Sequence, residues 1–397
     1  MNSIKTEQYC PCGSGRLYTE CCGVEGRTAL NADMLARLDK KGGVAEGELT
    51  EQLLTSVSQA ATSPDMFFAR YNFTEERAYM VKMTPQYYQD SIFLDPARIK
   101  GTCIIEANFK WIESIADSIE IQKMPMIFHT AFCGSTLMTQ ALQTVYNVLS
   151  LREPECLSNL LDLFRSQLRS DYFNNYWLDA ILKLLSKRYQ PGTVTVVKTN
   201  DFSNPMMNEI LDRHNEIPSL FMYTPLDEFV AGCLKAPNRR QWIKGRYQST
   251  LPYIDQLFAQ DFNQNSIGDQ NFVKMAAFYW SYNIALFFQA WRAHPERIRS
   301  LDFNEMLNNP MQTLEACGDW FGLEKSEDGN TEEKIEALFG VYSKDSQMKY
   351  STQQRRVEIQ KQLAGYVDEL DEAKQLANQL LGDDYPTASL PATLLDK

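Results

Sequence analysis

The chain has 397 residues, of which 44% are hydrophobic and 12% aromatic, so it can bury one large core with small attachments. A formal net charge of −12 argues against a general nucleic-acid surface or a basic membrane patch. No apolar run approaches the roughly 20 residues of a membrane span, and the first residues lack the apolar stretch of a secretory signal. We therefore expect a cytoplasmic protein without nucleic-acid partners.

The N-terminal segment holds four of the nine cysteines, Cys10, Cys12, Cys21 and Cys22. Two close thiol pairs separated by a Gly-containing stretch can close a tetrahedral zinc site. Two disulfides or unbound thiols are the alternative, which the absence of an export signal disfavours. The pattern Cys-Pro-Cys-Gly-Ser-Gly followed by Tyr-x-x-Cys-Cys-Gly resembles the SEC-C motif. That resemblance implies a structural zinc ion, a docking role for residues 1–23 toward a protein partner, and no catalysis.

Beyond this motif the sequence predicts a linker with one or two short helices, a lead-in with a strand pair, a large α/β domain and a helical C-terminal segment. We place these parts at residues 24–64, 65–120, 121–350 and 351–397. The expected strands of the lead-in are 67–73 and 78–83, and those of the main domain are 193–198, 219–224 and 298–303, with one more before the loop described next. Helical patterns occupy 157–188, 205–213, 226–235, 271–293 and 352–381.

The stretch from Met124 to Leu142 reads as a buried strand, a tight glycine turn and an amphipathic helix. Backbone N–H groups of Gly134, Ser135, Thr136 and Leu137 would converge at the helix start, where the helix dipole favours an anion. The spacing copies a Walker A loop. However, His129 replaces its first glycine and Ser135 its lysine, which argues against an ordinary ATPase.

Strands that alternate with helices predict a mostly parallel sheet covered on both faces, that is, a P-loop-like three-layer α/β/α fold. Ligands of such folds sit at the carboxyl ends of the strands. Two candidate catalytic residues fall there. Lys198 ends a strand and can stabilise charge on a transferred anionic group, and Glu153 can take a proton from a hydroxyl or amine. Each alone is equally explained as a surface or helix-start charge.

The block from about 92 to 350 resembles the P-loop sulfotransferase superfamily, particularly its bacterial and tyrosylprotein-sulfotransferase-like branches. The residues that carry the resemblance are the loop Cys133 to Leu137, the Arg152-Glu153-Pro154 triplet, the strand-end Lys198 and the stretch 301–323, which ends in Trp-Phe-Gly-Leu. The resemblance implies transfer of a sulfuryl group from 3′-phosphoadenylyl sulfate to a small-molecule or protein acceptor, without a catalytic metal.

Two cations of the family pattern are absent. Phe132 stands where members usually carry Lys or Arg in the loop, and the usual strand-end Arg with a Ser eight residues later, which grips the donor's 3′-phosphate, is replaced by Tyr223 or Thr224 followed by Ala231 or Gly232. If the usual donor binds, other cations must serve. The candidates are Lys235, Arg239, Arg240 and Lys344, and more remotely Arg355 and Arg356.

Several of these residues have plainer explanations. Arg239 and Arg240 beside Trp242 equally suit a solvated turn with a packed aromatic, and His129 suits a satisfied core residue slightly better than a phosphate donor. Cys133 lies at a helix start that favours a thiolate, but it lacks a histidine motif for covalent work. A regulatory binding protein on a degenerate P-loop is the alternative function, and a nucleotide kinase has little support.

Overall fold

The computed structural model describes two compact units of the chain. The first unit comprises Met1–Pro125 and Asn147–Ser203, and the second comprises Met126–Tyr146 and Asn204–Lys397. The four cysteines predicted to bind zinc, most of the predicted linker and Lys344 lie outside the described residues. The described part is residues 61–397 without 73–76, 96–97, 100–103, 166–170, 259–266, 269–270, 327–330, 343–344, 350–351, 383–388 and 396–397.

A five-stranded sheet flanked by helices makes this an α/β protein, as the sequence predicts. The strand order is β5-β6-β4-β7-β8, and β5 with β6, β4 with β7, and β7 with β8 pair in parallel. All residues of β4 to β7 are buried, because a parallel sheet is covered on both faces. The bounds are β4 Met126–His129, β5 Val148–Arg152, β6 Val194–Lys198, β7 Ser219–Tyr223 and β8 Ile298–Asp302.

The first unit also contains a three-stranded antiparallel sheet in the order β1-β2-β3. The expected strand pair is present, and β3 is an additional strand that the sequence analysis missed. The helical pattern at 157–188 corresponds to two helices, α6 and α7. The bounds are β1 Met66–Asn72, β2 Arg77–Lys82, α3 Pro85–Asp90, β3 Ile104–Asn108, α4 Phe109–Asp117, α6 Glu155–Arg165 and α7 Asp171–Leu185, with the 3-10 helix η2 at Asp201–Met206.

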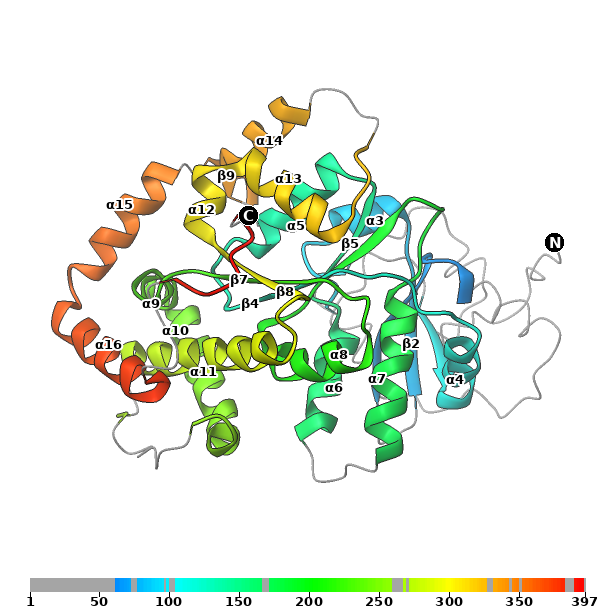
Figure 1. The fold of residues 1–397 in the computed structure, drawn as a ribbon, viewed down its shortest axis with the longest axis horizontal. Coiled ribbons are helices and arrows are strands. Elements are labelled where there is room, and N and C mark those ends of the chain that lie inside the picture. The colour runs from blue at the N-terminus through cyan, green and yellow to red at the C-terminus, as the bar shows by residue number, and fades with distance from the viewer. Residues whose placement is uncertain are drawn as a thin grey trace. The chain divides into compact units, whose positions relative to one another are not determined.

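In the second unit, helices lie on both sides of β4, β7 and β8, with α5 and α13 on one side and α8 and α11 on the other (Figure 1). The helices are α5 Ser135–Val145, α8 Met207–Arg213, α9 Leu226–Leu234, α10 Pro237–Thr250, α11 Phe272–Ala293, α12 Phe303–Asn308, α13 Pro310–Phe321, α14 Thr331–Phe339, α15 Thr352–Leu363 and α16 Val367–Leu381. The 3-10 helix η3 spans Leu251–Gln256, and β9 Val341–Tyr342 pairs antiparallel with β10 Asp345–Lys349.

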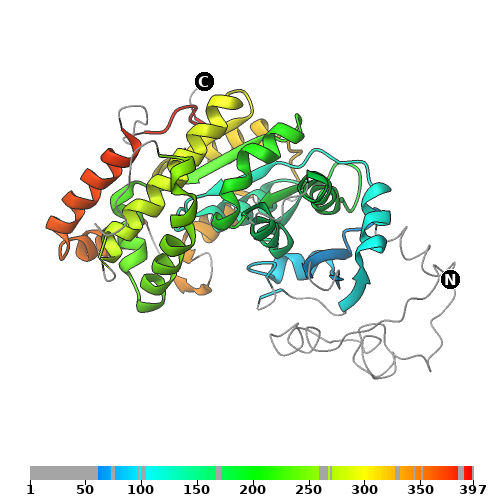
Figure 2. The ribbon, with the colours of Figure 1, turned by 90° about the horizontal axis from the view of Figure 1, so that it is seen from below.

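Helix α11 forms the centre of the second unit. Most of its 22 residues are buried, which fits a helix that is hydrophobic around its whole circumference. It packs against α8, α9, α10 and α16, and α16 stays beside it in the turned view (Figure 2). None of the helices in the described part of the chain is long and apolar enough to cross a membrane.

Candidate functional site

The loop between β4 and α5 has an unusual backbone. Ala131, Phe132 and Gly134 have φ angles of 69°, 54° and 71°, all in the left-handed region. Glycine adopts this region freely, but for other residues it stores about 1–3 kcal/mol each, held by the surrounding structure. Such outliers concentrate at ligand sites, so two of them beside a glycine favour a functional loop.

Neighbouring residues hold this loop in place. The ring nitrogen Nδ1 of His129 accepts a hydrogen bond from the Ala131 N–H at 3.0 Å, and the backbone oxygen of His129 accepts one from Asn204 Nδ2 at 2.9 Å. A Cβ atom on Gly134 would lie 2.1 Å from the ring of Phe303, so only glycine fits there. His129 therefore shapes the loop through its Nδ1 atom.

The first turn of α5 follows directly. Its N-cap is Gly134, which has no side chain to cap the N–H groups, and no acidic residue occupies its first turn. Ser135, Thr136 and Leu137 are buried, as is Cys133. The opening N–H groups of a helix need partners from outside it, and an anion can supply them. This stretch can therefore hold a phosphate or sulfate group.

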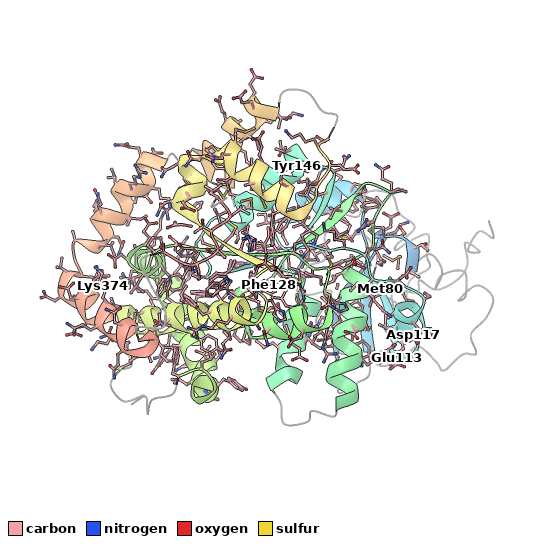
Figure 3. The ribbon with its side chains drawn as sticks, viewed as in Figure 1. Met80, Glu113, Asp117, Phe128, Tyr146 and Lys374 are labelled. Atoms are coloured by element: carbon pink, nitrogen blue, oxygen red, sulfur yellow. The ribbon has the colours of Figure 1, made fainter. Side chains whose placement is uncertain are left out.

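The far end of α5 is anchored to α13. Tyr146, the residue that ends α5 (Figure 3), donates its hydroxyl to the backbone oxygen of Leu314 at 3.0 Å. Its ring lies against Gly318, where a Cβ atom would meet the phenol oxygen at 2.2 Å. The helix that follows the loop is therefore fixed at its C-terminal end.

The loop residue Phe132 is covered by an arginine. The guanidinium of Arg239 lies 4.6 Å from the centroid of the Phe132 ring and donates to the backbone oxygen of Gly232 at 2.9 Å. Arg240 Nε donates to the backbone oxygen of Leu234 at 3.2 Å. Both arginines thus cap carbonyls near the end of α9, and Arg239 also brings a positive charge beside the loop.

Lys235, another predicted phosphate-binding cation, lies at the surface. Lys235 is 40% exposed and forms an ion pair with Glu358 of α15 at 2.7 Å. Of the remoter arginines, Arg356 donates to Asn308 Oδ1 at 3.0 Å, whereas Arg355 is buried. In the second unit the structure thus brings Arg239 to the loop residue Phe132 and Arg355 to Phe303, the ring against Gly134.

In the first unit, the predicted catalytic residues contact each other. Lys198 Nζ donates to Glu153 Oε1, and Asn200 Nδ2 donates to Glu153 Oε2 at 3.3 Å. The Lys198 side chain is 1% exposed, that of Glu153 is 15% exposed, and the ring of Phe93 lies 5.0 Å from the ammonium. An ion pair with so little solvent experiences strong electrostatic coupling, which is the setting that chemistry on a charged group needs.

The backbone explains how Glu153 reaches Lys198. Glu153 has a φ of 54°, and its N–H donates to the backbone oxygen of Lys198 at 2.7 Å, just beyond the parallel pair of Arg152 with Lys198. Arg152 is buried and donates to the backbone oxygen of Gln89 at 2.8 Å, and desolvation lowers its pKa to about 10. The strand β5, which the sequence analysis missed, therefore positions the predicted base.

The same unit buries a second lysine, which carries none of the roles predicted from the sequence. Lys187 follows α7, and its Nζ donates to the backbone oxygen of Met66 at 2.5 Å. Desolvation by burial lowers its pKa to about 7, and the charge of Asp65 opposes this shift. Its ammonium contacts a lead-in residue and its backbone oxygen accepts from the Thr195 hydroxyl at 2.6 Å, and neither partner carries a predicted role, so we interpret it as structural.

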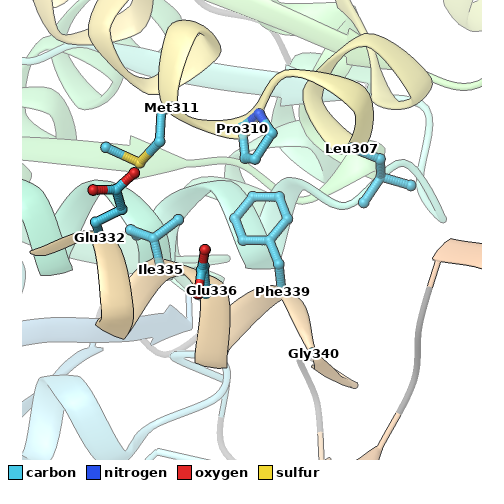
Figure 4. A pocket seen from close by; sticks show the side chains of 8 residues that line it. All are labelled: Leu307, Pro310, Met311, Glu332, Ile335, Glu336, Phe339 and Gly340. Atoms are coloured by element: carbon cyan, nitrogen blue, oxygen red, sulfur yellow. The ribbon is translucent and has the colours of Figure 1, made fainter.

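A surface pocket of about 360 Å³ lies elsewhere in the second unit, where α14 faces α12 and α13 (Figure 4). Ile335, Phe339 and Met311 form its apolar part, and the carboxylates of Glu332 and Glu336 stand at it. None of the predicted site residues lines it, so it is separate from the loop.

Two solved structures are similar to this chain, both described as sulfotransferases. The one from Alicyclobacillus acidocaldarius is 14% identical, with a TM-score of 0.32 over 63% of this chain and 95% of that one. The one from Mycobacterium avium is 12% identical, with a TM-score of 0.37 over 88% of this chain and 98% of that one. No family model and no curated protein matches the chain. Likenesses this weak do not bear on chemistry, so function rests on the residues themselves.

Proposed function

We propose that the protein is a sulfotransferase that moves a sulfuryl group from 3′-phosphoadenylyl sulfate to a hydroxyl or amine of a small-molecule or protein acceptor. The observation that carries this proposal is the loop: three left-handed residues turn the chain so that α5 begins with uncapped N–H groups. These groups suit the phosphosulfate of the donor.

The Glu153–Lys198 pair supplies the second half of the proposal. In the reaction, the acceptor oxygen or nitrogen bonds to sulfur while the bond from sulfur to the bridging phosphate oxygen breaks, which releases adenosine 3′,5′-bisphosphate. Glu153 accepts the acceptor's proton, and Lys198 stabilises the charge that develops on the leaving oxygen. Because Lys198 donates to Glu153 in the ligand-free protein, it has to exchange that partner for the donor.

Calorimetric titration of the full chain with adenosine 3′,5′-bisphosphate tests the binding half. A matched pair of loop variants sharpens it, because Ser135→Glu would place a carboxylate at the helix start while Ser135→Gln keeps its size. We expect binding to wild type, a loss of at least tenfold in Ser135→Glu and a smaller loss in Ser135→Gln. Absence of binding to the zinc-loaded wild type contradicts the proposal.

The chemical half can be measured without knowing the acceptor, as slow hydrolysis of 3′-phosphoadenylyl sulfate to the bisphosphate and sulfate. We expect Lys198→Met and Glu153→Gln each to lower this rate by about 10²-fold or more, with bisphosphate affinity changed much less. Equal rates in wild type and both variants would remove the pair from the reaction.

A binding or regulatory protein on the same fold is the second candidate. It is favoured by Lys198, whose 1% exposed ammonium is already engaged by a carboxylate, and by Phe132 in place of a cation. Under this alternative, the wild type binds the bisphosphate but releases no sulfate from the donor, and the Lys198 and Glu153 variants bind as the wild type does.

We also propose that Cys10, Cys12, Cys21 and Cys22 bind one structural zinc ion, which serves docking to a protein partner. Metal analysis of the purified chain should find about one zinc per molecule. The double variant Cys21→Ser with Cys22→Ser should lose it, whereas Cys233→Ala, far along the sequence, should keep it. Full zinc content in the double variant contradicts this site.

A further inference from the structure

Arg355 of α15 brings a buried guanidinium to the carboxyl ends of β7 and β8. One of its terminal nitrogens donates to Asn304 Oδ1 at 3.1 Å. The other lies 3.5 Å from Thr224 Oγ1 and 2.5 Å from Glu228 Oε2. Thr224 follows β7 and Asn304 opens α12 after β8, so parallel strands bring both to the sheet edge at which ligands bind in open α/β folds.

This guanidinium is linked to the phosphate loop through one aromatic ring. It lies 4.6 Å from the centroid of Phe303, and the same ring packs against Gly134. All of these residues belong to the second unit. A ligand with one anionic group on the N–H groups of α5 could therefore present a second anionic group to Arg355.

Glu228 can release Arg355 without being left unsatisfied. Its Oε2 atom also accepts from the Thr224 hydroxyl at 3.0 Å, and its Oε1 atom accepts from Asn304 Nδ2 at 2.9 Å. A buried carboxylate that loses every partner is costly, but this one keeps two neutral donors when the arginine leaves. An incoming phosphate would give the planar guanidinium an equivalent bidentate partner.

Helix α15 is attached to the second unit mainly through charged and polar groups. Among its described side chains, residues 353–363, only Arg355 is buried, and Val357 is 55% exposed. Its other contacts include the exposed ion pair of Glu358 with Lys235 and the hydrogen bond of Arg356 with Asn308. Solvent screens exposed pairs of this kind, so the Arg355 contacts dominate the attachment.

We propose that Arg355 is a ligand-binding residue held in reserve by Glu228, and that a phosphate-type group of the ligand on the loop takes the guanidinium from this carboxylate and thereby resets the position of α15. This inference rests on the proposed function for the identity of the ligand, but its residues and its switch are separate from Glu153 and Lys198. The proposal supplies a cation at the carboxyl ends of the strands, where the sequence has Tyr223 or Thr224 in place of a strand-end arginine.

Three variants, first shown to fold by circular dichroism and thermal melting, test the switch. Glu228→Gln keeps the size and the neutral hydrogen bonds but removes the competing charge. Arg355→Met removes the guanidinium but keeps a long apolar side chain on Phe303. Lys374→Ala is the control, because Lys374 forms an exposed ion pair with Asp227, the residue beside Glu228.

Two readouts are needed: hydrogen exchange of the backbone in residues 352–363, and calorimetric binding of adenosine 3′,5′-bisphosphate and of inorganic pyrophosphate. We expect faster exchange of α15 in both Glu228→Gln and Arg355→Met. Binding should tighten severalfold in Glu228→Gln and weaken about 10- to 100-fold in Arg355→Met, the range of a charged hydrogen bond. Lys374→Ala should match the wild type in both readouts.

The outcomes separate this inference from the proposed function. Wild-type binding of the bisphosphate with unchanged affinity in Arg355→Met overturns the inference and leaves the function intact. Binding of pyrophosphate that depends on Arg355, without binding of the bisphosphate, supports the inference and contradicts the donor. Binding of neither probe to the wild type, or unchanged α15 exchange in Glu228→Gln, overturns the switch.

Discussion

Each unit of the protein contains a buried cation paired with a partly buried carboxylate, and the two pairs are assembled by different means. Glu153 directly follows β5 and Lys198 ends the neighbouring strand β6, and the register of the two strands, which pairs Arg152 with Lys198, places the two side chains together. Glu228 and Arg355 are separated by 127 residues and meet only because α15 packs on α9. In the first pair, the side chain of Lys198 is 1% exposed and that of Glu153 is 15% exposed. In the second pair, the side chain of Arg355 is 10% exposed and that of Glu228 is 20% exposed.

This difference in assembly decides how the two members of each pair can move apart. The backbones that carry the first pair are fixed by the hydrogen bonds between two neighbouring strands, so only its side chains can change partners and its chemistry has to occur within a fixed frame. The second pair can separate by movement of one weakly attached helix while the sheet stays intact. We therefore expect the first pair to act as a rigid centre and the second as an adjustable contact.

The largest effect is expected from Lys198→Met. Removal of one partner from a buried ion pair leaves the other charge uncompensated, which costs about 3–5 kcal/mol. Urea denaturation should show this loss in the free energy of unfolding. The double variant with Glu153→Gln should recover most of it, because no unpaired charge remains. A loss below about 1 kcal/mol in Lys198→Met would mean that solvent reaches the site, and the rigid-centre interpretation would be abandoned.

Gly134→Ala should destabilise the second unit by about 2–4 kcal/mol. The new methyl group would overlap the Phe303 ring and would also force alanine into a left-handed conformation. Thermal melting measures the effect, and Phe303→Leu in the same chain should relieve part of it. Gly245→Ala on exposed α10, where no atom lies within 4 Å, is the control and should stabilise slightly. Equal melting temperatures for both alanine variants would contradict the packing described for Phe303.

Lys187, a buried lysine whose ammonium donates to the backbone oxygen of Met66, should titrate near neutrality. The pKa of Lys187 is lowered from 10.5 to about 7 by burial. Between these values the unfolded chain binds more protons than the folded one, so the contribution of Lys187 to stability rises with pH across that window and is least favourable below pH 7. The difference in unfolding free energy between wild type and Lys187→Met should therefore rise by about 1 kcal/mol per pH unit between pH 7 and 9. Parallel curves would mean that Lys187 keeps an ordinary pKa.

The smallest effect is expected from Lys374→Ala. Lys374 and Asp227 are 47% and 39% exposed and lie 3.0 Å apart. Solvent screening and side-chain entropy leave such pairs worth about 0.5 kcal/mol or less. Urea denaturation at low and high salt should show little change. A loss comparable to that of Lys198→Met would erase the distinction between buried and exposed pairs.

The sequence predicted the parts of the site that depend on local pattern. The strand, glycine turn and helix around Gly134 were identifiable, because a glycine after an apolar run marks a turn before a helix start. Lys198 was identifiable as a strand end. Strand β5 was missed because its five residues follow α5 after only two residues, and so short an apolar run next to a helix carries little periodicity of its own.

Long-range contacts were beyond sequence reasoning. Nothing local to Arg355 distinguishes it from Arg356, yet one is buried against Phe303 and the other is exposed. The division of 352–381 into α15 and α16 follows from Gly365, which interrupts the helix, and a charged pattern alone did not reveal it. The roles predicted for the site residues and the zinc cysteines stay predictions.

The anchoring of α5 has a mechanical consequence. An α-helix of 11 residues is a stiff rod about 16 Å long, so a displacement of its first turn cannot be absorbed along its length. Tyr146 would pass that displacement to α13 through Leu314 and Gly318. On α13 sits Trp320, whose indole donates to the backbone oxygen of Ser219 at 3.1 Å. Binding of an anion at the loop should therefore change the fluorescence of the Trp320 indole, which lies far from the loop along α5 and α13.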